Sequence, residues 1–286
     1  MEIPRSAKPK IQLRMTDGYK KVNKIVGKNR LNTVCEEARC PNIYDCWGRE
    51  TATIMILGGM CTRSCGFCSV KTGKPSLVDI NEPIRISQAV KEMGLRHIVL
   101  TSVDRDDLKK DFGATIWAKT IMTIRKISPN CTIEVLTPDF QGYLPALQKV
   151  FDARPDIFSH NVECVERISK KIRIQAVWRR SLNVLKQSVE YGLLTKSGMM
   201  VGLGETEKEV LTTMLQVAKL GVKKFTVGQY LQPTKKHLPV SRYVELGEFD
   251  MYKREGLKMG FKIIESGPLV RSSYHADKQA LLALKV

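Results

Sequence analysis

One stretch of this chain joins an apolar segment to a cysteine loop, and it reads Thr53-Ile54-Met55-Ile56-Leu57-Gly58-Gly59-Met60-Cys61-Thr62-Arg63-Ser64-Cys65-Gly66-Phe67-Cys68. The apolar segment predicts a buried strand, and the loop has the spacing C-x3-C-x2-C. A cubane iron–sulfur cluster normally takes four cysteine ligands. A loop with three thiolates therefore predicts a cluster in which one iron stays open to bind a small molecule.

Two plainer interpretations of this loop are a zinc site and three unrelated core thiols. Structural zinc takes four ligands, usually in two separated pairs. No second C-x2-C follows the loop, and no histidine lies close to it. The spacing therefore favours a cluster over both alternatives.

A second cysteine trio lies upstream of the loop, at Cys35, Cys40 and Cys46. Its spacing is C-x4-C-x5-C, so it also supplies three thiolates and also lacks a fourth ligand. The chain shows no signal peptide that would favour disulfides. We interpret the trio as a second cluster site, with a zinc knuckle as the alternative.

Composition sets bounds on partners and class. The chain has 286 residues, enough for one large core, and its 47 basic against 29 acidic residues give a net charge of +18. This charge favours acidic partners, such as nucleic acid or an acidic carrier protein. No RNA- or DNA-binding motif appears, and the aromatic residues are not interleaved with basic ones for stacking. The apolar stretches are too short for a transmembrane helix. We therefore expect neither a nucleic acid nor a membrane as partner.

Apolar, β-rich runs alternate with helical patterns along the chain. The runs that predict strands are 52–57, 97–101, 132–137, 156–160, 197–201 and 224–228. The helical patterns are 84–94, 114–127, 143–151, 181–191 and 207–220, followed by a helix at 245–259 and a possible strand at 261–265. Such alternation implies a parallel sheet with right-handed crossovers. The predicted fold class is α/β, a partial TIM-type (βα)6 barrel with an N-terminal extension and a C-terminal tail.

We expect three parts along the chain. Residues 1–48 form an extension that carries the upstream trio, residues 49–265 form the barrel, and residues 266–286 form the tail. In parallel barrels the working groups gather where the strands end. We expect both cysteine trios at that face. His97, at a strand start, receives no catalytic role, and the isolated Cys131 and Cys164 are interpreted as core residues.

The chain resembles the lipoyl synthase family of the radical S-adenosylmethionine (SAM) superfamily. The resemblance runs from about Lys8 to Asp277, and its most specific part combines the two trios with the terminal Arg-Ser-Ser-Tyr. Further matches are Val-Leu-Thr-Ser-Val-Asp-Arg-Asp-Asp-Leu (99–108), Leu-Thr-Pro-Asp-Phe (136–140), His-Asn-Val-Glu (160–163), Met-Val-Gly-Leu-Gly-Glu-Thr (200–206), Gly-Gln-Tyr-Leu-Gln-Pro-Thr-Lys (228–235) and Ser-Gly-Pro-Leu-Val-Arg-Ser-Ser-Tyr (266–274).

The resemblance implies two [4Fe-4S] clusters. One, on Cys61, Cys65 and Cys68, would bind SAM through its open iron and yield a 5′-deoxyadenosyl radical. The other, on Cys35, Cys40 and Cys46, would be completed by the oxygen of Ser273. An alkoxide matches iron less well than a thiolate does, so this corner would open easily. Without the family, Ser273 reads as part of an ordinary polar tail.

The implied activity is the insertion of sulfur at C6 and C8 of an octanoyl group on a lysine of a lipoyl carrier protein. Polar chemistry does not remove hydrogen from an unactivated methylene, whereas a primary carbon radical does. Each lipoyl group would use two SAM molecules, and the auxiliary cluster would be consumed as the sulfur source.

Six residues at strand ends are candidate SAM contacts, namely Thr101, Ser102, Asn161, Glu163, Gly202 and Gly204. The loop after Thr101-Ser102 meets the methionine amino group in the superfamily, and Asn161 with Glu163 would hold the ribose. The glycines would let backbone approach a ligand at a helix start with free N–H groups. The alternatives are a solvated acidic turn, a polar pair at the core edge and a capping box of Thr206 with Glu209.

The resemblance also implies partners. These are octanoylated lipoyl domains of 2-oxoacid dehydrogenase E2 subunits, the glycine cleavage H protein, an electron donor such as flavodoxin or ferredoxin, and iron–sulfur carrier proteins. The N-terminus does not have the pattern of a transit peptide, so we expect a cytoplasmic protein.

Some residues depart from the family pattern. Phe112 stands where the family usually has Gly, Asp45 where it has Glu, and Gln175 and Trp178 replace Arg and Tyr. Two other functions remain possible on the residues alone. One is a radical SAM sulfur inserter acting on tRNA or dethiobiotin, and the other is a basic zinc module that binds nucleic acid.

Overall fold

The protein is described here by a computed structural model, which describes residues 9, 14–274 and 276. Its main sheet has eight strands in the order β1-β2-β5-β6-β7-β8-β9-β10. The strands are β1 (Asn32–Thr33), β2 (Thr53–Ile56), β5 (His97–Ser102), β6 (Thr132–Leu136), β7 (Ile157–Ser159), β8 (Thr195–Val201), β9 (Lys224–Gln229) and β10 (Ile263–Gly267). All neighbours from β2 to β10 are parallel, and β1 pairs antiparallel with β2.

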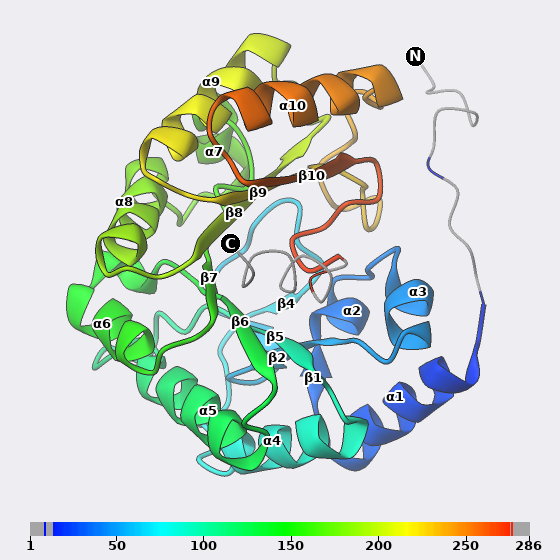
Figure 1. The fold of residues 1–286 in the computed structure, drawn as a ribbon, viewed down its shortest axis with the longest axis vertical. Coiled ribbons are helices and arrows are strands. Elements are labelled where there is room, and N and C mark those ends of the chain that lie inside the picture. The colour runs from blue at the N-terminus through cyan, green and yellow to red at the C-terminus, as the bar shows by residue number, and fades with distance from the viewer. Residues whose placement is uncertain (1–8, 10–13, 275, 277–286) are drawn as a thin grey trace.

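Helices cover the outside of this curved sheet (Figure 1). They are α4 (Glu82–Met93), α5 (Ala114–Ile127), α6 (Leu144–Asp152), α7 (Glu166–Ile172), α8 (Trp178–Glu190), α9 (Glu207–Lys219) and α10 (Leu246–Lys258). Each of the strands predicted from the sequence is present, and the possible strand at 261–265 is β10. The predicted partial (βα)6 barrel is confirmed, because β1 and β10 remain as the two edges of an open sheet.

The segment before the barrel packs against its first edge. It contains α1 (Asp17–Lys28), α2 (Val34–Glu37) and α3 (Ile43–Gly48) beside β1 (Figure 1). The helix α1 begins because the side chain of Thr16 accepts a hydrogen bond from the backbone of Tyr19. Val22 and Trp47 are fully buried in a small core that this segment shares with α4.

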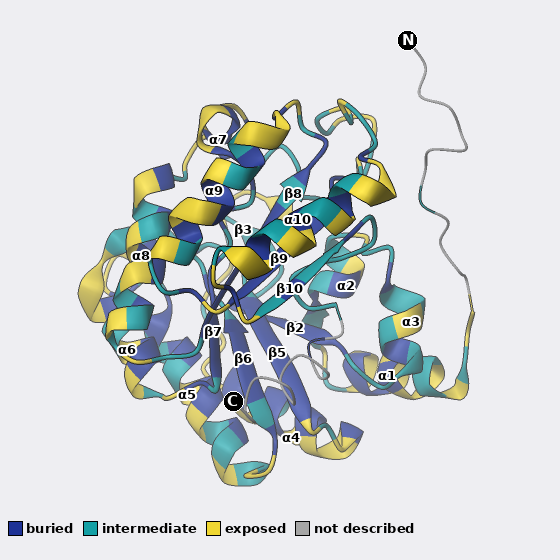
Figure 2. Ribbon diagram, turned by 45° about the horizontal axis from the view of Figure 1, so that its top comes forward, coloured by how far each residue is buried: buried dark blue, intermediate teal, exposed yellow. Residues whose placement is uncertain are grey.

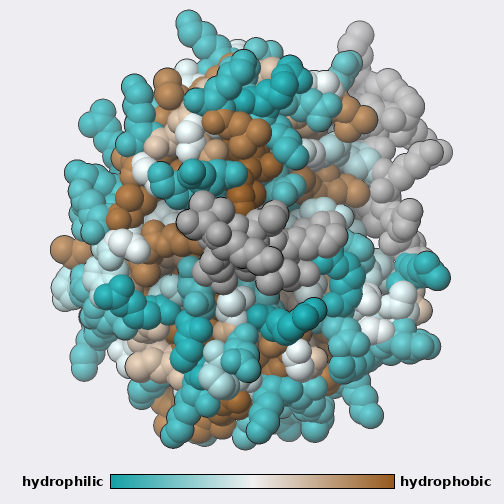
Figure 3. Space-filling model, in the orientation of Figure 1, coloured by the Kyte–Doolittle hydropathy of each residue, from teal (hydrophilic) through white to brown (hydrophobic). Residues whose placement is uncertain are grey.

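The barrel core is apolar between the sheet and its helices. Figure 2 shows buried strands surrounded by helices that are buried on their inner side and exposed on their outer side. One cluster of apolar side chains lies around β2, β5 and β6, and another around β8 and β9. In the view of Figure 3 hydrophilic side chains cover most of the rim. No described helix has the length and apolar character that a membrane span requires.

The segment after β10 crosses the sheet instead of leaving it. A Cβ atom on Gly228 of β9 would lie 2.1 Å from the carbonyl oxygen of Val270. The side chain of Asn42, between α2 and α3, donates a 2.7 Å hydrogen bond to the carbonyl of Leu269. The C-terminal segment is thereby held between the barrel and the N-terminal segment.

Candidate functional site

The downstream trio lies in a loop fixed by backbone hydrogen bonds. Cys61 ends β3 (Met60–Cys61), which pairs with β4 (Lys71–Thr72). The amide of Gly66 donates to the carbonyl of Ile172 at 2.7 Å, and the amide of Cys68 donates to the carbonyl of Cys65 at 3.0 Å. A Cβ on Gly66 would lie 2.9 Å from Leu238, so the loop fits closely against that side chain. The loop follows β2 at the carboxyl ends of the strands, as predicted.

The three thiols of this loop lie near one another and carry no disulfide. Burial raises the pKa of Cys65 to about 12 and that of Cys68 to about 11, and a neighbouring thiol of the trio adds to both shifts. Backbone amides of Arg63 and Asp104 point at the sulfur of Cys61, at 3.4 and 3.3 Å. Thiols in such a place become thiolates only beside positive charge, which bound iron supplies. The donor set therefore fits a three-thiolate cluster.

Arg63, inside the cysteine loop, is the centre of a buried ion network. Its guanidinium contacts Asp106 at 2.7 Å and Asp139 at 2.7 Å, and it is only 4% exposed. Arg180 adds a second cation at 3.1 Å from Asp139. The network joins the cysteine loop to the loops after β5 and β6. Sequence reasoning missed Arg63, although an arginine between two predicted ligands and an Asp-rich loop at the next strand end were visible signals.

Thr101 and Ser102 lie at the end of β5, as predicted. The hydroxyl of Thr101 donates to the carbonyl of Leu136 at 3.0 Å, and that of Ser102 donates to the carbonyl of Val103 at 2.8 Å. Each hydroxyl thus has a backbone partner. The nearby Asp104 has its pKa raised to about 6, because burial outweighs the charge of Arg63.

Asn161 and Glu163 follow β7 at the carboxyl ends of the strands. The side chain of Asn161 bonds to Glu163, whose charge in turn acts on Cys65 and Cys68. Glu163 has a φ of 66°, a left-handed conformation that is costly for a residue other than Gly. Arg173 also acts on Glu163 and on Cys65, and sequence reasoning missed it because it lies in a basic run.

Gly202 and Gly204 follow β8, and two of the N–H groups that were expected to be free at this turn already have a partner. The carboxylate of Glu205 accepts hydrogen bonds from the amides of Gly202 and Leu203, at 2.5 and 2.9 Å. Gly202 has a φ of 92°, and a Cβ there would lie 2.1 Å from Gln229. The glycine at 202 is thus explained by packing. The capping box predicted for Thr206 and Glu209 is present.

The expectation that the upstream trio lies at the carboxyl ends of the strands was wrong. Cys35, Cys40 and Cys46 line a pocket with Thr53 and His97, the first residues of β2 and β5. The reason is the antiparallel strand β1. Its last residue, Thr33, pairs with Ile54 near the start of β2, so the chain enters α2 at that end.

Ser273 lines the same pocket as the upstream trio, together with Arg271 and Tyr274. Two contacts bring it there in addition to that of Asn42. The buried ammonium of Lys196 in β8 donates to the carbonyl of Ser272 at 2.5 Å. Gly228 leaves room for the backbone of Val270, as described above. The structure therefore brings the predicted hydroxyl and the three thiols together from opposite ends of the chain.

The electrostatics of this pocket fit a bound cluster. Burial raises the pKa of Cys35 to about 12 and also raises that of Cys46, and the neighbouring thiol of Cys40 adds to both shifts. Burial lowers the pKa of Arg271, against the opposing effect of Cys40. Iron would hold the thiols as thiolates, and their charge would balance this arginine.

A group of charged residues inside the barrel borders the pocket, and sequence reasoning missed it. Glu134 of β6 accepts from Lys196 at 2.9 Å, and both side chains are at most 1% exposed. The ring of His97 lies 3.9 Å from Glu134 and 2.8 Å from the hydroxyl of Thr132. Burial lowers the pKa of Lys224 to about 8 although Glu134 opposes the shift. These residues alternate with apolar ones in short strands, which the sequence does not distinguish from an ordinary half-buried strand.

Three of the four departures from the family pattern lie on the barrel, whereas Asp45 lies in α3 beside Cys46 of the upstream trio. The side chain of Gln175 accepts a 3.3 Å hydrogen bond from the amide of Ser64 in the cysteine loop. Phe112 has a φ of 53°, a conformation favoured by Gly, and packs edge-on against Tyr143. Trp178 is buried at the start of α8. Cys131 and Cys164 are buried in apolar clusters, as expected.

Within the described residues, no three His, Cys, Asp or Glu side chains converge on a position for a single metal ion. Such a site would hold one metal ion by several ligands at once. A cubane cluster is different, because each of its four iron atoms binds its own ligand.

The chain matches the model of the radical SAM superfamily over residues 55–217. It is 55% identical over 264 residues to the lipoyl synthase of Rubrobacter xylanophilus, covering 92% of this chain and 82% of that one. It is 50% identical over 273 residues to the lipoyl synthase of Flavobacterium psychrophilum, covering 95% and 94%. The mitochondrial lipoyl synthase of Nematostella vectensis is 48% identical, with 96% of each chain covered.

Solved structures share the fold at low sequence identity. SuiB of Streptococcus suis, bound to S-adenosylmethionine, has a TM-score of 0.61 at 10% identity over 80% of this chain, which spans 55% of SuiB. Methylornithine synthase has a TM-score of 0.56 at 12% identity, with 91% of this chain and 81% of that chain covered.

Proposed function

The chain belongs to the lipoyl synthase family of the radical SAM superfamily, and on that premise we propose which of its residues carry the activity. The enzyme inserts sulfur at C6 and C8 of an octanoyl group on a lysine of lipoyl carrier proteins. It uses two [4Fe-4S] clusters and SAM, with the auxiliary cluster as the sulfur source.

We propose separate tasks for the two cysteine trios. Cys61, Cys65 and Cys68 hold the cluster that binds SAM, and Cys35, Cys40, Cys46 and Ser273 hold the auxiliary cluster. The observation that carries this assignment is a single pocket lined by both Ser273 and the upstream trio, which are far apart in the sequence. When bound, the clusters and SAM supply the radical that removes hydrogen and the sulfur that replaces it.

The remaining residues hold and shield these groups in this proposal. Arg63 fixes the cysteine loop through Asp106 and Asp139. Asn161 and Glu163 are proposed to contact SAM, a role supported by the effect of the Glu163 charge on Cys65 and by the bond of Asn161 to Glu163. Thr101, Ser102 and Gly204 border the same strand ends, whereas the amide of Gly202 is already bonded. Lys196 and Gly228 keep the C-terminal segment beside the upstream trio.

The enzyme acts on lipoyl carrier proteins, and we propose octanoylated E2 lipoyl domains and the glycine cleavage H protein as the particular ones. A flavodoxin or ferredoxin as electron donor, and iron–sulfur carriers that rebuild the auxiliary cluster, complete the proposed partners. The division at residues 1–48, 49–265 and 266–286 is proposed as an extension, a barrel and a tail that meet at the auxiliary site. The cytoplasmic location stays a prediction.

Anaerobic purification and turnover test the function. The loaded protein should be brown with about eight iron atoms per chain. With SAM and a reductant it should convert an octanoyl-lysine peptide to the lipoyl form, read by mass. A colourless zinc protein, or an unchanged peptide with both clusters loaded, contradicts the function.

Six single Cys→Ala variants test the assignment of tasks. Variants at the downstream trio should lose SAM cleavage and product together. Variants at the upstream trio should still release 5′-deoxyadenosine but form no lipoyl product. Cys131→Ala and Cys164→Ala are the matched controls, since these thiols lie in apolar clusters, and both should keep activity. Product formation by an upstream variant would rule out the auxiliary site.

A further inference from the structure

Two neighbouring loops beside the cysteine loop form an exposed surface that is both apolar and basic. We call it the lysine surface, and it consists of Lys71, Lys74, Leu77, Ile80, Lys109 and Lys110. Leu77 is 95% exposed and Ile80 is 73% exposed. The two residues are three positions apart in one loop, and large apolar side chains exposed to this degree favour a site of interaction.

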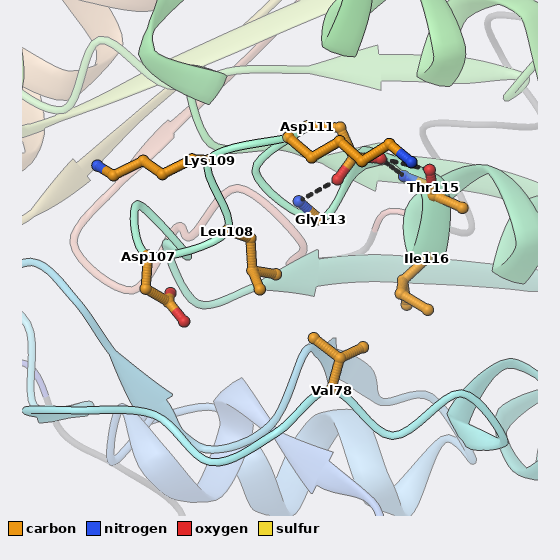
Figure 4. Close-up of a pocket in the computed structure, with 9 residues that line it drawn as sticks. Val78, Asp107, Leu108, Lys109, Asp111, Gly113, Thr115 and Ile116 are labelled. Atoms are coloured by element: carbon orange, nitrogen blue, oxygen red, sulfur yellow. Dashed lines mark hydrogen bonds between the residues drawn. The ribbon is translucent and has the colours of Figure 1, made fainter.

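The two loops meet across a hollow of about 400 Å³, lined by Val78 from one loop and by Lys109 and Lys110 from the other. In Figure 4 Val78 faces Leu108 and Ile116 across this hollow. The lysine surface is thus interrupted by an apolar depression, into which a side chain of a partner can fit.

Buried contacts hold the surface in place. The guanidinium of Arg105, only 4% exposed, donates to the carbonyls of Ser76 at 3.0 Å and Leu57 at 3.3 Å. The amide of Gly73 donates to the carbonyl of Cys61 at 3.0 Å. The surface is therefore rigidly connected to the cysteine loop and adjoins the carboxyl ends of the strands.

The charge of the surface is uncompensated. The acidic side chains beside it already have cationic partners. Asp79 pairs with Arg85, Asp107 pairs with Arg105, and Asp111, which lines the hollow, pairs with Lys149. Within the described part of the chain, the four lysines of the surface form no ion pair with a carboxylate. Four positive charges around exposed apolar groups complement an acidic surface with apolar groups of its own.

We propose that the lysine surface docks the acidic carrier domain whose octanoyl-lysine enters the site. This inference rests on the proposed function and adds the place where the partner binds. Exposed leucine and isoleucine favour a protein over a nucleic acid, since stacking on bases requires aromatic side chains. The connection through Gly73 to Cys61 puts the docked domain next to the proposed radical site.

The test compares a whole carrier domain with a short peptide. Lys109→Glu/Lys110→Glu and Leu77→Ser/Ile80→Ser should each raise KM for the octanoylated domain about tenfold, because complementary charge and apolar contact with the domain are lost. Turnover of the octanoyl-lysine peptide should stay within about twofold of wild type, since the peptide does not reach this surface. The control Lys208→Glu/Lys219→Glu makes the same charge change on exposed lysines of α9 and should leave both substrates unaffected.

The outcomes separate the two proposals. Failure of the wild type to convert the peptide overturns the proposed function itself. Normal peptide turnover with an unchanged KM for the domain in both surface variants overturns the docking site. An equal rise of KM in the α9 control would mean that only the net charge of the protein affects carrier binding. That result would also overturn the docking site. If the surface variants instead lose binding to RNA and keep the wild-type KM for the domain, the surface belongs to a nucleic acid.

Discussion

The ammonium of Lys196 donates a 2.5 Å hydrogen bond to the carbonyl oxygen of Ser272. Lys196 is completely buried in β8, and Ser272 precedes the proposed cluster ligand Ser273. The same ammonium contacts Glu134 at 2.9 Å, so the cation is neutralised inside the barrel. A buried charge pair is expensive to assemble and seldom adds net stability. Its contribution here is to fix the backbone beside the auxiliary pocket.

Replacing Lys196 should release the C-terminal segment. Lys196→Met removes the cation that Glu134 contacts at 2.9 Å and leaves it the charge of Lys224, so we expect a loss of up to about 3–5 kcal/mol of unfolding free energy. The double variant Glu134→Gln/Lys196→Met removes this pair of charges and should recover part of that stability, because Lys224 then loses the carboxylate that opposes its desolvation. Both variants should lose auxiliary iron, falling from about eight to about four iron atoms per chain. Chemical denaturation of the apoprotein and iron analysis of the reconstituted protein measure the two effects.

The double variant separates positioning from stability. Amide hydrogen exchange at residues 269–274 should rise in it even where its unfolding free energy approaches that of wild type. Full auxiliary iron and unchanged exchange in the double variant would show that Lys196 only stabilises the fold.

Gly228→Ala should displace the same segment by sterics. The new Cβ would lie 2.1 Å from the carbonyl of Val270, a backbone atom that has to shift. We expect a loss of about 1–3 kcal/mol of unfolding free energy and a matching loss of auxiliary iron. Gly27→Ala in α1 is the matched control, because nothing lies within 4 Å of its Cβ. That change should stabilise the protein by about 0.5–1 kcal/mol and leave the iron content unchanged. Equal behaviour of the two variants in thermal melts would disprove the close crossing.

Two substitutions at Ser273 should have opposite effects on iron and similar effects on product. Ser273→Cys offers a softer ligand that binds iron more tightly, so the auxiliary cluster should be retained. Because a thiolate is released less easily, lipoyl product should still fall. Ser273→Ala removes the ligand and should lower both iron and product. Iron analysis and single-turnover mass spectrometry measure the two quantities, and normal product from Ser273→Ala would exclude Ser273 as a required ligand.

The sequence was sufficient for the barrel because its strands and helices repeat a strong local pattern. β2, for example, is buried at every position, is apolar from Ile54 to Ile56, and precedes a cysteine loop of recognisable spacing. Both cysteine trios could be chosen on spacing alone. Ser273 could be identified as a ligand only through the resemblance to the family, since a single hydroxyl forms no recognisable sequence pattern.

The location of the auxiliary pocket could not be predicted from local pattern. It depends on β1, which has only two residues and reverses the direction of the chain before α2. The ion networks were missed for a related reason. Arg63 and Asp139 are 76 residues apart and meet only when the barrel curves. Their pairing is a property of the tertiary structure.

The pairing of Asp139 with Arg63 should make stability depend on acid pH. Burial acts to raise the pKa of Asp139, but the hydrogen bond and charge of Arg63 outweigh it and lower that pKa from 3.8 to about 2. The lowered pKa means that the unfolded chain takes up a proton first as the pH falls. The stabilisation is therefore complete above pH 3.8 and is lost as the pH falls towards 2, with a total on the order of 2 kcal/mol.

Asp139→Asn should remove this dependence. The variant loses stability at pH 7, because Arg63 and Arg180 each lose a buried anion, and its unfolding free energy should change less than that of wild type between pH 4 and pH 2. Asp250→Asn is the control, since it makes the same change at an exposed residue of α10. Urea denaturation of the apoproteins at several pH values gives the comparison. Parallel curves for wild type and Asp139→Asn over that range would show that Arg63 does not hold the carboxylate in its ionised form.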